Sequence, residues 1–138
     1  MTVAELLALF ALFGVPIRRH EAEAIQRVEA RRHLPPGLLP AVCAAMTRSR
    51  RLRIPSDPDI ERPRDLVCAA GQTAPGGRFI VPTTVTAARR LAEGLRVCTG
   101  PEAALYYATS GRCRLILGNW EGSNAVHYYR RILALRPH

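Results

Sequence analysis

The sequence predicts a single, mostly α-helical domain with long irregular loops. Its 138 residues suffice for one hydrophobic core but are few for two. Hydrophobic residues make up 48% of the chain and charged residues 22%, a composition typical of globular proteins. Apolar residues recur at helical spacing in several segments, and clusters of Gly and Pro separate these segments.

The first helix is expected within residues 1–18, packed on a domain formed by residues 19–138. Its apolar stripe consists of Ala4, Leu7, Phe10 and Ala11. The segment lacks the basic start of a signal peptide, carries Glu5 early, and places arginines after the apolar stretch rather than before it. About ten apolar residues are also too few to span a bilayer. We therefore expect a packed helix, which leaves the localisation undefined.

A second helix is expected from Arg19 to Arg32, with Ala22, Ile25, Val28 and Glu29 on one face. Pro35-Pro36-Gly37 interrupts the helical pattern, and Pro36 can start a third helix. The apolar positions of that third helix are Leu38, Leu39, Val42, Ala45, Met46 and Ser49.

The remainder is predicted to alternate loops with shorter helices. Expected loops are 50–63, 71–82 and 110–123, and the last of these carries Trp120. Expected helices are 66–70 and one that Thr83-Thr84 cap and that runs to about Glu93, and a final helix starts at about Asn124. Residues 102–108 form a short apolar segment. The residues expected to face inward from that final helix are Ala125, Tyr129, Ile132 and Leu133.

The chain carries a formal net charge of +9, and all twenty basic residues are arginine. Such a surface attracts polyanions, whether nucleic acid, teichoic acids or an acidic cell wall. The arginines are spread through the sequence instead of forming one basic helix. Nucleic acid is therefore the least favoured partner.

The four cysteines are Cys43, Cys68, Cys98 and Cys113. They form no CxxC pair and have no histidine at zinc-ligand spacing, so we expect neither a metal site nor a cofactor. The four cysteines could form one or two disulfides, in three possible pairings. Cys43 lies in an apolar helical run and is expected to be a buried free thiol.

Glu29 is the strongest catalytic candidate. It follows Ile25 by four residues, which places its carboxylate on the face that should be buried. It also lies at the end of its helix, where the macrodipole disfavours negative charge. A carboxylic acid in such surroundings can donate a proton. The alternative is a structural ion pair with Arg32 or Arg48.

Several short motifs in chain order resemble the SleB-type cell-wall hydrolases, the spore-cortex-lytic family and its relatives. They are Glu29-Ala30-Arg31, Gly37, Met46-Thr47-Arg48, Val67-Cys68, Gln72, Phe79, Leu91-Ala92 with Gly94, Ala104-Leu105-Tyr106-Tyr107, and His127-Tyr128-Tyr129. The resemblance covers residues 21–130. Where the family has Gly-Glu after its first motif, this chain has Arg32-His33, and Thr47 replaces an asparagine.

This resemblance implies a lysozyme-like fold and a peptidoglycan-cleaving glycosidase. A lytic transglycosylase can use one acid, because the 6-hydroxyl of the muramic acid is its nucleophile. Glu29 would then protonate the leaving oxygen of the MurNAc–GlcNAc bond and accept a proton from that hydroxyl, giving a 1,6-anhydro product. If water attacked instead, the second carboxylate would be sought in loop 50–63.

A glycan strand is the substrate implied by this reaction, and sugars bind to aromatic faces and polar groups. The candidate substrate-binding residues are Gln72, Phe79, Tyr106, Tyr107, Trp120 and His127. His20 and His33 are expected on the surface.

A second alignment within the same superfamily stays open. Residues 34–42 resemble the start of the catalytic helix of soluble lytic transglycosylases, and 128–133 resemble their C-terminal helix. In that alignment Met46 occupies the position of the catalytic glutamate, and the domain would be inactive. We favour the first alignment because only it supplies an acid.

An enzyme is therefore the leading hypothesis. The main alternative is a catalytically weakened, lysozyme-like structural or interaction protein, such as a component of a virion, envelope or secretion assembly.

Overall fold

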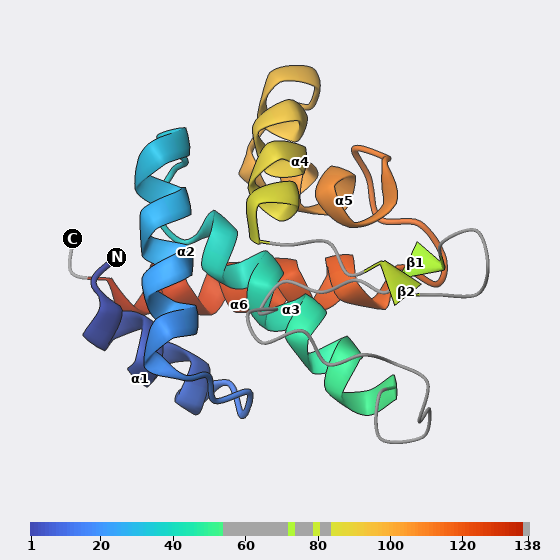
Figure 1. Cartoon of the computed structure of the whole chain (residues 1–138). Coiled ribbons are helices and arrows are strands. Elements are labelled where there is room, and N and C mark those ends of the chain that lie inside the picture. The colour runs from blue at the N-terminus through green and yellow to red at the C-terminus, as the bar shows by residue number, and fades with distance from the viewer. Residues whose placement is uncertain (54–71, 74–78, 81–83, 137–138) are drawn as a thin grey trace.

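The computed structural model describes residues 1–53, 72–73, 79–80 and 84–136, and this part of the chain is mostly helical (Figure 1). Its elements are α1 (Val3–Leu12), α2 (Arg19–Arg32), α3 (Leu38–Arg53), β1 (Gln72–Thr73), β2 (Phe79–Ile80), α4 (Thr84–Val97), α5 (Pro101–Ser110) and α6 (Trp120–Leu135). The two short strands pair antiparallel, with Gln72 opposite Ile80 and Thr73 opposite Phe79.

Helix α3 and helix α6 form the centre of the molecule. In Figure 1, α6 runs across the middle and α3 packs against it, while α1 and α2 lie toward the C-terminal end of α6. Helices α4 and α5 pack against each other, and α5 also contacts α6. Residues 37–47 are buried without exception, so the first half of α3 is enclosed on all sides. A helix that is apolar all round is expected in such a place.

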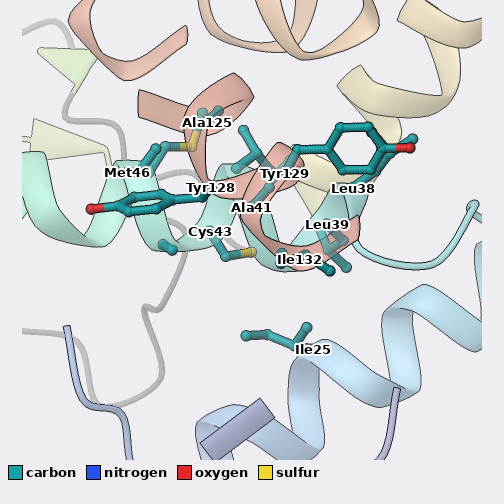
Figure 2. Packing of buried hydrophobic residues seen from close by; sticks show 14 of the residues in the cluster. Ile25, Leu38, Leu39, Ala41, Cys43, Met46, Ala125, Tyr128, Tyr129 and Ile132 are labelled. Atoms are coloured by element: carbon teal, nitrogen blue, oxygen red, sulfur yellow. The ribbon is translucent and has the colours of Figure 1, made fainter. Parts of the chain in front are cut away.

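The hydrophobic core takes side chains from each of the described helices, above all from α3 and α6, and Figure 2 shows part of it. Leu38, Leu39 and Met46 of α3 meet Ile132 and Ala125 of α6, and Ile25 of α2 closes the cluster from the side. The inward positions predicted for the third helix are confirmed, with Ser49 half-buried. Of those predicted for the final helix, only Leu133 is wrong, because 43% of it is exposed.

Two other expectations about helices were wrong. Helix α1 buries Leu6, Leu9 and Phe10, whereas Ala4 and Ala11 of the predicted stripe are exposed. Nearly every position of α1 is apolar, so spacing alone could not identify the buried face. The final helix begins one turn earlier than expected, because the side chain of Asn119 accepts a hydrogen bond from the Gly122 N–H and caps it.

A disulfide joins Cys98, just after α4, to Cys113 in the segment between α5 and α6. Cys43 is also disulfide-bonded, which corrects the expectation of a free thiol; its partner lies outside the described residues. Burial in an apolar helix did not distinguish a thiol from a half-cystine, because both are apolar.

The described part of the chain contains no helix long and apolar enough to cross a membrane. Residues 50–53 of the predicted loop 50–63 were wrongly predicted, because they belong to α3. The rest of that loop and the predicted helix 66–70 lie outside the described residues.

Gly94 allows α4 and α5 to pack closely. A Cβ atom added there would lie 3.0 Å from the Ala104 backbone Cα and carbonyl oxygen. In an unobstructed helix, Gly→Ala stabilises by about 0.5–1 kcal/mol. Here we expect Gly94→Ala to destabilise the fold by about 1–3 kcal/mol, because the two backbones must separate. Urea unfolding of the variant would measure this, and a gain in stability would contradict the close contact.

Candidate functional site

Glu29 is buried near the end of α2, as its position on the Ala22–Ile25 face predicts. Only 6% of the residue is exposed. The helix ends at His33, whose backbone is left-handed with φ 51°, and the Leu34 N–H bonds back to the Glu29 carbonyl at 3.3 Å. This turn brings the Pro-Pro-Gly segment before α3 back toward Glu29. His33 is exposed, as is His20, so both surface expectations are confirmed.

Both oxygens of the Glu29 carboxylate have partners. Oε1 lies 2.9 Å from the Met1 ammonium group, and the two side chains are 7% and 8% exposed. Oε2 accepts a hydrogen bond from the Gly37 N–H at 3.4 Å. The carboxylate therefore links α2 to residues before α1 and before α3. Neither Arg32 nor Arg48, the partners suggested by the sequence, provides these contacts.

Arg48 instead donates a hydrogen bond to the hydroxyl of Tyr128 at 3.0 Å. This bond raises the pKa of the Arg48 guanidinium above its usual value. The Tyr128 ring is buried and stacks on Phe13, with 4.4 Å between ring centroids. Tyr128 thus connects α3, α6 and the residue after α1.

A hollow of about 480 Å³ opens beside Glu29. It is lined by Met1, Gln26, Glu29, Ala30, His33 and Leu34. Gln26, Ala30 and His33 are exposed. His33 stands where the resembling family has its second acid, so the lining offers an imidazole and an amide next to one carboxylate. None of the aromatic candidates whose side chains the structure describes belongs to this lining.

Tyr106 and Tyr107 lie on α5 and are half-buried. Tyr106 packs against the hydrophobic core. A hydrogen bond with Glu93 of α4, together with burial, raises the pKa of the Tyr107 phenol. Both tyrosines thus take part in the packing of α4, α5 and the core.

Trp120 and His127 lie on α6 and are exposed. Trp120 is the first residue of α6, not a loop residue as predicted. The position of Ile132 on α6 shows how far Trp120 is from the carboxylate. Gly37, whose N–H donates to Glu29, packs against Ile132: a Cβ atom added to Gly37 would lie 3.0 Å from the Ile132 side chain. Ile132 lies twelve positions after Trp120 on the same helix, which corresponds to about 18 Å along the helix axis. Trp120 therefore does not lie at the carboxylate.

Gln72 and Phe79 occupy the two paired strands β1 and β2. The structure describes their backbone only, so a role of their side chains in sugar binding stays a prediction.

An exposed apolar loop is the feature that sequence reasoning missed. Residues 111–118 are exposed throughout, and large apolar side chains follow one another within them. The exposed fractions are 52% for Leu115, 37% for Ile116, 104% for Leu117 and 75% for Trp120. A run of three aliphatic residues inside a predicted loop was the available signal, because loops normally lack such runs.

Met46, the residue at the catalytic position in the second alignment, is 2% exposed. Figure 2 shows it beside Ala125, with Tyr128 on the neighbouring turn of α6. The first segment of that alignment comprises residues 34–37 before α3 and the start of α3, and the second lies in α6; these two helices form the centre of the fold.

Several arginines have partners within the chain, which limits the basic surface. Arg130 pairs with Glu102 at 2.7 Å, Arg19 with Glu23 at 3.2 Å, and Arg131 lies 4.9 Å from the centroid of the Phe13 ring. Within the described residues, no three His, Cys, Asp or Glu side chains are placed to hold a metal ion.

No known protein family, curated protein or solved structure matches this chain.

Proposed function

We propose that this chain is a catalytically inactive, lysozyme-like protein that acts as a structural or interaction component of an envelope or virion assembly. The observation that carries the proposal is the environment of Glu29. Its buried carboxylate is bound by two N–H donors of its own chain, which compensate a charge that would otherwise be buried without a partner. A proton donor must instead reach the leaving oxygen of the substrate.

The second alignment supports the same conclusion. It assigns the catalytic position to Met46, which is buried between α3 and α6 and carries no proton to donate. The residues of the first alignment also have structural uses. Gly94 and Ala104 form the close contact between α4 and α5, and Tyr128 is a core residue. Motifs that serve packing support a shared scaffold and leave the chemistry open.

The cysteines support a location outside the reducing cytoplasm. Cys43, Cys98 and Cys113 are all disulfide-bonded. Structural disulfides persist in oxidising compartments, including the periplasm and the surfaces of cells and virions.

Peptidoglycan assays would test the proposal directly. Purified wild-type protein and the Glu29→Gln variant would be incubated with peptidoglycan, with an active lysozyme as positive control. We expect no loss of turbidity and no anhydro-muramic ends by mass spectrometry for either form. Clearing by the wild type that is lost in Glu29→Gln would overturn the proposal.

Stability measurements separate the two roles of Glu29. Glu29→Gln should lower the free energy of unfolding by about 1–3 kcal/mol, because a buried charged hydrogen bond is lost. The matched control is Glu23→Gln on the same helix, whose partner Arg19 and own side chain are 77% and 48% exposed. An exposed pair of this kind contributes about 0.3–0.5 kcal/mol. Equal losses for both variants would argue against a structural role for Glu29.

Peptidoglycan cleavage by Glu29 as a single acid and base is the second candidate function. The specific observation in its favour is the open hollow in which Glu29 lies beside Gln26 and His33. A sugar entering this hollow would have to displace the Met1 ammonium from the carboxylate. The assay above distinguishes the two functions.

A further inference from the structure

The segment 112–120 consists of the loop before α6 and the first residue of that helix; it is here called the apolar loop and presents hydrophobic side chains to solvent. Its start is held by the Cys98–Cys113 disulfide. Its end is held by Asn119, whose side chain caps α6 and donates a hydrogen bond to the Thr109 hydroxyl at 3.0 Å. Between these points, the Asn119 N–H bonds to the Ile116 carbonyl at 3.2 Å. The loop that carries the exposed side chains is thus anchored to the fold at both ends.

The apolar side chains of this loop form a continuous exposed patch. Leu115, Ile116, Leu117 and Trp120 line one open hollow of about 350 Å³ together with Gly118, Asn119 and Ser123. Leu117 projects fully into solvent. Monomeric proteins seldom expose such a group of large apolar residues unless another molecule or a membrane covers it.

The charges of the loop indicate what kind of surface covers the exposed apolar side chains. Arg112 and Arg114 are exposed, and the loop contains no acidic residue. The whole chain carries a net charge of +9. Leucines that insert below the headgroups, a tryptophan at their level and arginines beside the phosphates are the combination that binds anionic bilayers.

The size of the patch distinguishes a lipid surface from a protein partner. A stable protein interface buries about 800 Å² on each side and draws on 20–30 residues from several elements. Here the exposed large side chains come from a single short loop. A projecting leucine such as Leu117 needs a matching pocket on a protein partner, whereas a bilayer accommodates it without one.

We propose that the apolar loop docks the protein on an anionic lipid surface, with Leu115, Leu117 and Trp120 entering the interface and Arg112 and Arg114 contacting lipid phosphates. This inference goes beyond the proposed function and holds whether or not Glu29 is catalytic. It describes peripheral attachment through a loop.

The chain provides its own probe for the test, since Trp120 is its only tryptophan. The full chain would be mixed with vesicles of phosphatidylcholine alone or of phosphatidylcholine and phosphatidylglycerol in equal parts. We expect co-sedimentation with the anionic vesicles and a shift of Trp120 emission to shorter wavelength, together with protection from a water-soluble quencher. Binding should weaken as salt is raised, because exposed charges are screened.

Two variants and one control assign the binding to the loop. Leu115→Ser with Leu117→Ser should weaken vesicle binding by at least about tenfold. Arg112→Gln with Arg114→Gln should weaken binding to anionic vesicles and reduce its salt dependence. The control is Val85→Ser with Val97→Ser on α4, which removes two exposed aliphatic side chains outside the loop, 49% and 50% exposed, and should leave binding unchanged.

Three results would overturn the proposal. The first is no co-sedimentation and no emission shift for the wild type, as expected if a protein covers the loop instead. The second is binding that the leucine variant retains in full, which would indicate adsorption through charge alone. The third is equal weakening by the α4 control. Unchanged circular dichroism of each variant would confirm that the fold is intact.

Discussion

Tyr128→Ala is expected to lower the free energy of unfolding by about 3–5 kcal/mol, the range measured for large buried aromatic residues. Tyr128 is 2% exposed and stacks on Phe13 at 4.4 Å. Its hydroxyl also accepts a hydrogen bond from Arg48. The truncation would therefore leave a cavity at the junction of α1, α3 and α6, and a domain of this size has only about 5–15 kcal/mol of stability in total.

Tyr128→Phe is the matched control, because it keeps the ring and removes only the hydroxyl. It should cost about 1 kcal/mol, the usual net contribution of one hydrogen bond. Tyr106→Ala provides a second comparison at a half-buried tyrosine and should cost less than Tyr128→Ala. Urea unfolding followed by circular dichroism would measure all three. A Tyr128→Ala loss no larger than that of Tyr128→Phe would show that the ring packing contributes little.

The helical fold could largely be predicted from sequence, because apolar residues recur at helical spacing in most helices or because Gly and Pro mark the ends of the helices. Helix α2 was predicted with its observed bounds, since polar residues alternate with the Ala22–Ile25–Glu29 face. Helix α1 was predicted as a helix with the wrong buried face, because its exposed positions are apolar as well. The strands β1 and β2 are two residues long, too short for a detectable alternation.

The candidate site could be predicted only in part. Burial of Glu29 follows from local spacing, and the structure confirms it. Its partners are 28 and 8 residues away along the chain, and one of them is a backbone N–H. Such contacts depend on how α1 and α3 pack, which no local pattern encodes. The aromatic candidates were grouped with Glu29 by family resemblance, whereas the length of α6 separates Trp120 from it.

Replacing both Cys98 and Cys113 by serine is expected to lower the free energy of unfolding by about 3 kcal/mol. The two cysteines are 15 residues apart, and closing a loop of this length by a covalent bond removes about that much conformational free energy from the unfolded state. The double variant leaves Cys43 and its own disulfide in place, so it isolates one bridge, which a reducing agent would not do. Urea unfolding of the oxidised proteins would measure the difference. A loss below about 0.5 kcal/mol would mean that residues 98–113 are equally constrained without the bridge.

The same double variant should also bind anionic vesicles more weakly than the wild type, although every side chain that enters the lipid is retained. The disulfide holds the start of the apolar loop, and Asn119 holds its end. Without the bridge, ordering residues 112–118 on the membrane would add an entropic cost to binding. Vesicle titrations at a temperature where the variant remains folded separate this effect from unfolding. Unchanged affinity would show that the apolar side chains bind lipid from any backbone conformation, and that the bridge contributes to stability alone.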